Sequence, residues 1–144
     1  MIALQASRAA TSSPFASLDT ARWPRLGVGC ASLGSPAIGD DDAVAVLEHA
    51  WQKGIRLYDV APLYGGGLGE ERLGRMLLDK PRERYVLTTK TGVTRPRGQP
   101  ATPPGSALPR SADRWDFSRA ATRASIMCSC ARLNVDRIDV VYLH

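Results

Sequence analysis

Short apolar segments alternate with amphipathic segments through residues 25–144, and this alternation limits the possible folds more than any other feature. The apolar segments have the length and β-branched bias of strands, whereas the amphipathic ones carry apolar residues at helical spacing. The predicted order is β-α-β-α-β-α-β. Because such connections join parallel strands, the sequence predicts a parallel sheet with right-handed crossovers. The expected strands are residues 25–30, 55–60, 85–90 and 138–143, and the expected helices begin near Asp40, Glu70 and Ser118.

Each expected helix has an apolar stripe that should face the core. Acidic residues favour helix N-termini and glycine favours the position after a helix end, so residues 40–42 and Gly54 predict the bounds of the first helix. Pro81 predicts the end of the second helix, and Ser118 is the expected N-cap of the third. The stripes are Val44, Leu47 and Trp51, then Leu73, Met76 and Leu77, and finally Ala124, Met127, Cys128 and Ala131.

Two architectures share this order of elements. One is a doubly wound open sheet, and the other is part of a (β/α)8 barrel. The first expected strand continues into GCASLGSPAIG, which differs from the tight GxGxxG turn that leads into a helix in dinucleotide-binding units. A Rossmann unit is therefore disfavoured.

Two segments do not follow the alternating pattern. Residues 1–24 are rich in alanine, serine and threonine without periodicity, so we expect a loose N-terminal arm. Residues 91–114 hold five of the ten prolines, and we expect a long loop there without strand or helix. The remaining chain, residues 25–144, is expected to form one folded unit.

Composition and charge exclude several classes of protein. With 44% hydrophobic and 23% charged residues the chain can build a core, and no apolar run approaches the roughly 18 residues of a membrane-spanning helix. Ten lysines and arginines oppose three acidic residues between positions 80 and 123, which leaves an anion- or nucleic-acid-binding domain as one alternative function. Because aromatic platforms and known binding modules are missing, we expect a solvated surface instead, with neither nucleic acid nor membrane as a partner.

Three cysteines, Cys30, Cys128 and Cys130, form an odd set in a sequence without an apolar secretory core. This usage predicts free thiols and a cytoplasmic location. Cys128 and Cys130 are two residues apart in an expected helix, where their side chains point about 200° apart. They cannot bind one metal ion together, so we expect no metal site and assign both to packing.

Four ionisable residues lie at the C-terminal ends of expected strands. In parallel α/β folds, the chemistry gathers at this edge of the sheet. Each residue alone could have an ordinary structural role: an aspartate can cap a helix, a lysine can lie on the surface, a tyrosine can pack in the core, and a histidine can simply end the chain. The four are Asp59, Tyr64, Lys90 and His144.

Together these four side chains suit proton transfer to a carbonyl oxygen. A neighbouring ammonium makes a phenol a better acid, and a carboxylate can hold that ammonium in place. A histidine can orient the oxygen. Because none of these groups can carry hydride, the set implies a nicotinamide cofactor, NADP or NAD. The glycines at 65–67 lack a following GK[ST] and so do not form a P-loop.

Three stretches of the sequence resemble the aldo-keto reductase superfamily. They are GIRLYDVAPLYGGGLGEERLG, YVLTTK and LNVDRIDVVYLH. The resemblance covers residues 25–144 and implies a (β/α)8 barrel, with catalytic roles for Asp59, Lys90 and His144 and a general-acid role for Tyr64. Within the family, the triple glycine and the Pro/Arg-rich loop look most like bacterial members that act on sugars, near D-threo-aldose (L-fucose-type) and pyridoxal dehydrogenases. A small carbonyl compound or sugar is the implied substrate.

LGVGCASLG resembles the first strand of the family, near the nicotinamide. The resemblance therefore implies cofactor contacts from Gly29, Cys30 and Asp59. Cys30 stands where the family commonly has threonine.

The length of the chain departs from the family pattern. A (β/α)8 domain needs about 250 residues, whereas this chain has 144 and four expected strands. We therefore expect about the first half of the barrel, β-α-β-α-β-α-β, from a truncated reading frame. The alternative function is a catalytically inactive remnant that lacks the cofactor-binding C-terminal half.

Overall fold

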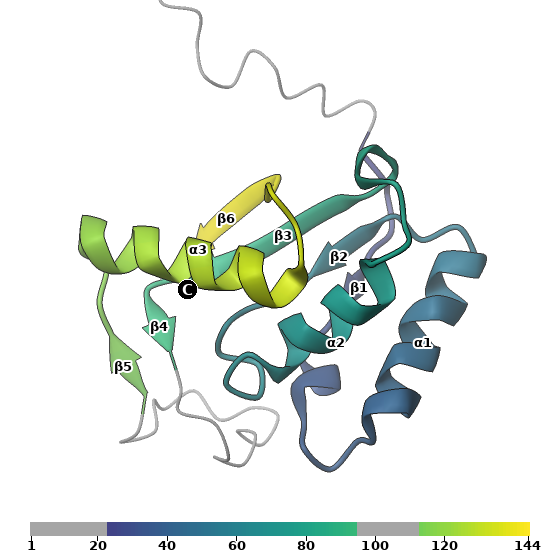
Figure 1. The fold of residues 1–144 in the computed structure, drawn as a ribbon, viewed down its shortest axis with the longest axis horizontal. Coiled ribbons are helices and arrows are strands. Elements are labelled where there is room, and N and C mark those ends of the chain that lie inside the picture. Colours follow the sequence, from purple (N-terminus) through teal and green to yellow (C-terminus); the bar gives the residue numbers. More distant parts are fainter. Residues whose placement is uncertain (1–22, 95–112) are drawn as a thin grey trace, which may run out of the picture.

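The computed structural model describes residues 23–94 and 113–144, and its main feature is one parallel sheet (Figure 1). The four strands lie in the order β1-β2-β3-β6, and each neighbouring pair is parallel. The strands are β1 (Val28–Gly29), β2 (Leu57–Asp59), β3 (Val86–Thr91) and β6 (Val140–Leu143). The helices are α1 (Asp40–Gln52), α2 (Leu68–Leu77) and α3 (Arg119–Leu133), with short 3-10 turns at Ser32–Gly34 and Arg82–Arg84.

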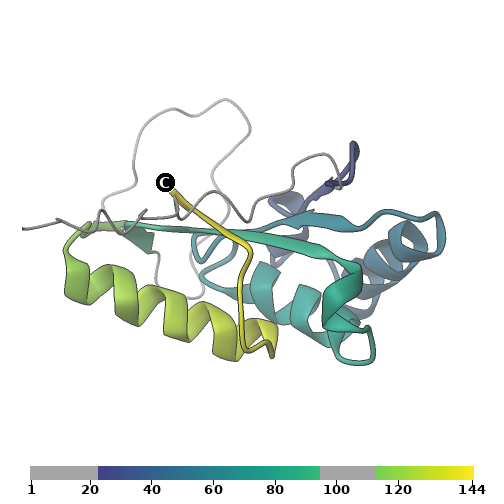
Figure 2. The ribbon, with the colours of Figure 1, turned by 90° about the horizontal axis from the view of Figure 1, so that it is seen from above.

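The strand order separates the two architectures left open by the sequence. In a doubly wound sheet the order reverses at a switch point, and helices cover both faces. Here the neighbours follow chain order, and α1, α2 and α3 all lie on one side of the sheet (Figure 2). The described residues therefore have the arrangement of the first half of a (β/α)8 barrel.

The helix ends follow local capping rules. Three aspartates occupy the first turn of α1, and Gly54, with φ +87°, follows its C-terminus. Ser118 caps α3 as predicted, because its hydroxyl accepts a hydrogen bond from the Ala121 N–H at 3.2 Å. Helix α2 begins at Leu68, two residues earlier than expected.

The core lies between the sheet and the helices. Leu73, Met76 and Leu77 of α2 are buried, as the apolar stripe predicts. Leu47 of α1 and Leu87 of β3 join the same cluster. This packing fixes the positions of the strand ends at which the candidate site forms.

The predicted core face of α3 is wrong. Ala124, Met127, Cys128 and Ala131 are exposed, whereas Ser129 and Leu133 are buried. The buried side of α3 contacts polar side chains of α2 and β3. The most apolar stripe of this helix therefore lies on its exposed side, and a prediction from apolarity alone chooses the wrong face. Cys128 is thus not a packing residue, and Cys130 is only partly buried.

The outer strands of the sheet are more exposed than predicted. Of the expected strand 25–30 only Cys30 is buried, and Leu26 is 73% exposed. Val141, Tyr142 and Leu143 of β6 are also exposed, although the sequence predicts a strand covered on both faces. Both strands are edges of the described sheet, and this position decides their burial.

The prediction of a loop without strands at 91–114 is also wrong at its ends. β3 extends to Thr91, and β4 (Val93–Thr94) pairs antiparallel with β5 (Arg114–Trp115). Residues 95–112, like the expected arm up to residue 22, lie outside the described residues. Among the described helices, none has the length and apolarity needed to cross a membrane.

Candidate active site

Asp59 and Lys90 form the centre of the site. Asp59 is the last residue of β2, and Lys90 lies near the end of β3, on the face of the sheet opposite the helices. The Lys90 ammonium donates to both carboxylate oxygens of Asp59, at 2.9 and 2.7 Å, and to the Val60 carbonyl at 3.1 Å. Parallel pairing of the two strands brings these ends together, as the sequence predicts.

Tyr64 lies beside the Lys90 ammonium, whose nitrogen is 5.0 Å from the centre of the phenol ring. The loop that carries Tyr64 turns sharply at Gly65, where φ is +68° and a Cβ atom would overlap the Gly34 carbonyl oxygen. Only glycine fits this close approach. The glycine-rich run after Tyr64 therefore shapes its loop.

Burial lowers the pKa of Lys90, but its interactions with Asp59 and then with Tyr64 outweigh this effect, and the pKa rises above its ordinary value. Asp59 and Val60 accept the three hydrogen bonds found for the Lys90 ammonium. An ammonium group has no lone pair, so the phenol O–H of Tyr64 cannot donate to Lys90. The phenol proton of Tyr64 is consequently directed away from Lys90.

His144 completes the group predicted from the sequence. Its ring packs edge-to-face on Tyr64, with centres 6.1 Å apart, and its backbone N–H donates to the Thr91 carbonyl at 2.9 Å. Burial, and next the positive charge of Lys90, lower the pKa of His144, so that its neutral form prevails at pH 7. Its buried Nδ1 has no hydrogen-bond partner among the described residues.

Gly29 and Cys30 reach the same edge of the sheet from β1. Gly29 is paired with Asp59, is exposed, and has no atom within 4 Å of where a Cβ would stand. The Cys30 N–H donates to the Asp59 carbonyl at 2.8 Å. Burial, and next the charge of Asp59, raise the pKa of the Cys30 thiol to about 12. Cys30 is therefore a neutral thiol under the open surface of Gly29.

Sequence reasoning missed Thr88, which holds the carboxylate of Asp59. The Thr88 hydroxyl donates to Asp59 Oδ1 at 2.6 Å, and Thr88 is 2% exposed. The alternation of strand residues could have revealed it, because Thr88 is two residues before Lys90 and so faces the same side of β3.

Sequence reasoning also missed a buried ion pair on the helix side of β3. Glu70 is fully buried, and its carboxylate accepts hydrogen bonds from Arg132 at 2.6 Å and from the Thr89 hydroxyl at 2.8 Å. The pair joins α2 and α3 to β3, directly behind Lys90. A glutamate in the first turn of a helix is ordinarily exposed, so nothing local in the sequence indicates this role.

The geometry thus gathers the four predicted side chains around one space at the C-terminal edge of the sheet. Within residues 23–94 and 113–144, no three histidine, cysteine or acidic side chains are grouped so that they could hold a metal ion. The arrangement is suited to proton transfer, with a phenol beside a fixed ammonium and a neutral imidazole.

Comparison with known proteins identifies the family of the chain. A family model described as the aldo/keto reductase family matches residues 25–144. The chain belongs to the aldo/keto reductase family. Its sheet and helices are therefore the first half of that family's (β/α)8 barrel, and the family consists of oxidoreductases.

Among curated members of the aldo/keto reductase family, D-threo-aldose 1-dehydrogenase from a Pseudomonas species is 47% identical over 130 residues, covering 84% of this chain and 40% of that protein. Pyridoxal 4-dehydrogenase from Microbacterium luteolum is 37% identical over 133 residues, covering 83% of this chain and 39% of that protein. An aldo-keto reductase structure from Bacillus halodurans has a TM-score of 0.68 and 31% identity, covering 83% of this chain and 35% of that one. The chain thus spans about two fifths of the length of the curated relatives.

Proposed function

We propose that the protein containing these residues moves hydride between a nicotinamide cofactor, NADP or NAD, and a small carbonyl compound or its alcohol, with Tyr64 as the proton donor. The observation that carries the proposal is the contact of Lys90 with both Asp59 and Tyr64. The relatives named after aldose and pyridoxal dehydrogenation support a hydroxylated aldehyde, such as a sugar, as the substrate.

The proton path follows from the position and charge of Lys90. Because the Lys90 ammonium cannot accept a proton, the phenol proton of Tyr64 is free to go to a carbonyl oxygen held on the other side. As negative charge develops on that oxygen during reduction, Tyr64 releases its proton to it. The ammonium of Lys90 then stabilises the phenolate that remains. Alcohol oxidation uses the same steps in reverse.

His144 and Asp59 have positioning roles in this proposal. A neutral imidazole can donate one N–H to the carbonyl oxygen without competing as an acid. Asp59 holds Lys90 through two hydrogen bonds, so the ammonium stays beside Tyr64. Thr88 fixes the carboxylate of Asp59 in turn.

Gly29 offers an open backbone surface for a nicotinamide ring, which would supply or accept the hydride. Gly29 presents backbone without a side chain beside Asp59, and the space above it is open. The adjacent Cys30 is a neutral thiol and is fully buried. We therefore assign Gly29 and Asp59 to the surface that meets the cofactor, with Cys30 packed next to that surface.

The test replaces Tyr64 by phenylalanine in the protein that contains this chain, with nicotinamide absorbance followed during turnover of aldoses and small aldehydes. Loss of a general acid lowers the rate about 10²- to 10⁴-fold. Tyr85→Phe is the matched control, because Tyr85 precedes β3 at the opposite edge of the sheet, and it should retain activity. Equal activity of the Tyr64→Phe variant and the parent would rule out Tyr64 as the proton donor.

A further inference from the structure

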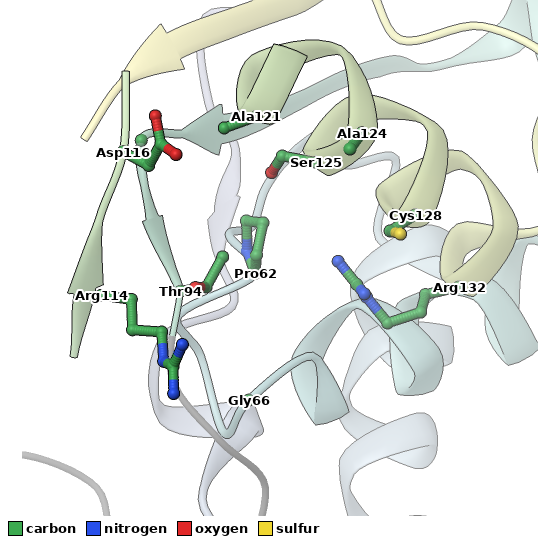
Figure 3. Close-up of a pocket in the computed structure, with 11 residues that line it drawn as sticks. Pro62, Gly66, Thr94, Arg114, Asp116, Ala121, Ala124, Ser125, Cys128 and Arg132 are labelled. Carbon is green, nitrogen blue, oxygen red and sulfur yellow. The ribbon is translucent and has the colours of Figure 1, made fainter. Parts of the chain in front are cut away.

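A hollow of about 400 Å³ lies beside α3 (Figure 3). One wall is α3, and the others are the β4–β5 hairpin and the loop that follows β2. Thr89 marks the helix side of β3, because its hydroxyl reaches Glu70 of α2, and Lys90 as the next residue faces the other side. Arg132 of the lining bonds to the same Glu70, and none of the four candidate active-site residues lines the hollow, so the hollow is separate from that site. Its lining includes Pro62, Gly66, Gly92, Arg114, Ser125 and Arg132.

Two buried hydroxyl groups near this hollow have no hydrogen-bond partner among the described residues. Ser125 belongs to the lining, but its Oγ lies beneath the surface. Thr91 is 1% exposed and is followed by Gly92 of the lining. A buried hydroxyl without a partner costs stability, so such groups in a folded protein point to a bound water.

The guanidinium groups of Arg114 and Arg132 lie on opposite sides of the hollow (Figure 3). The Arg132 side chain crosses close over Gly67, where φ is +99° and a Cβ atom would stand 2.7 Å from Arg132 Cδ. Nε of Arg132 bonds to Glu70 and Nη2 also lies 2.6 Å from that carboxylate, whereas no hydrogen bond of Nη1 to a described residue is found. Arg132 is therefore held in place with donors to spare.

Hydrogen-bond donors exceed acceptors around the hollow. The acidic residue of the lining, Asp116, already accepts from the Ser118 N–H at 2.8 Å at the start of α3. Arg114 and Nη1 of Arg132 can both donate. Such a set suits an acceptor-rich anion, and an arginine fork matches a planar carboxylate.

The remaining lining is apolar. Pro62, Ala121 and Ala124 contribute carbon surface and no polar side-chain atoms. A volume of about 400 Å³ is within the range of small-molecule sites. From the volume, the two arginines and these walls, we infer that the hollow binds a small organic carboxylate with a compact apolar body. Pro62 and Gly66 stand two residues before and after Tyr64, so the ligand contacts the loop that carries Tyr64.

The probe is benzoate, which has one carboxylate and one apolar ring. Titration of the chain, followed by amide NMR, should give saturable shifts at Gly66, Gly92 and Ser125. Arg114→Gln should weaken binding at least fivefold, whereas Arg119→Gln, a matched change of an exposed arginine outside the lining, should leave it unchanged. Ser125→Leu should abolish binding by filling the hollow.

Further arms separate this site from the proposed active site, where a carboxylate could bind at Tyr64 and His144. Tyr64→Phe should still bind benzoate in the hollow. Shifts confined to Tyr64 and His144, no saturable shifts, or equal binding by Ser125→Leu or Arg114→Gln would each overturn the inference. Equal affinity for uncharged benzyl alcohol would overturn the assignment of a carboxylate.

Discussion

The buried ion pair of Glu70 and Arg132 allows a quantitative test of how the site is held. Arg132→Met keeps much of the side-chain volume but removes the cation from a carboxylate that is fully buried. Thr89 remains as the hydrogen-bond partner of the Glu70 carboxylate. Removing one partner of a buried ion pair costs about 3–5 kcal/mol, because the other charge stays buried without compensation. We therefore expect the free energy of unfolding at pH 7 to fall by about that amount.

The predicted loss of stability in the Arg132→Met variant depends on pH. Without Arg132, the carboxylate of Glu70 binds a proton more readily in the folded chain than in the unfolded chain. The folded state then holds more protons, so the stability of the variant rises as the pH falls from 7 towards 5. Glu70→Gln combined with Arg132→Met is the control, since a neutral amide should make the loss smaller and independent of pH.

The measurement is urea unfolding followed by far-ultraviolet circular dichroism at pH 5, 6 and 7. A loss below about 1 kcal/mol at pH 7 would refute the reasoning, since that is the size expected of an exposed pair. An equal loss at pH 5 and pH 7 would show that the buried charge of Glu70 is not the cause.

Three further predictions follow from single contacts. Thr88→Val should cost about 1–2 kcal/mol in urea unfolding through the lost bond to the Asp59 carboxylate, whereas Thr88→Ser should cost less; equal losses would mean that the hydroxyl does not matter. Cys128 is exposed and should react quickly with a disulfide reagent, whereas Cys30 should react only on unfolding; a Cys30 that reacts as fast as Cys128 would contradict its burial. Because folding raises the pKa of Cys30 from 9.0 to about 12, the folded chain holds more protons and loses stability above pH 9, by about 1.4 kcal/mol per pH unit. The loss of stability above pH 9 should be smaller in the Cys30→Ala variant. An unchanged pH profile of stability in this variant would contradict the assignment of that loss to Cys30.

The strand ends were the most predictable part of the site. Asp59 and Lys90 close apolar segments, and parallel pairing brings such ends to one edge whatever the details of packing. The element order, the cap at Ser118 and the buried stripe of α2 are equally local in origin. Each depends on spacing along the chain, which the sequence states directly.

Packing between elements was not predictable in the same way. The sequence assigns an apolar stripe of α3 to the core, yet this helix turns Ser129 inward, towards the network of Glu70 and Arg132. A polar contact between α2 and α3 joins residues 62 positions apart, and no local pattern encodes such a partner. The hairpin of Val93 with Trp115 was missed for the same reason.

Taken alone, the sequence determined which residues stand at the ends of which strands, because hydrophobic periodicity and capping are properties of neighbouring residues. Only the tertiary structure decided that Lys90 donates to Asp59 and Val60 while its ammonium lies beside Tyr64, and that Thr88 holds the carboxylate of Asp59. Hydrogen bonds are directional and short, so their partners depend on how whole elements are placed. The direction of the Tyr64 proton follows from that placement.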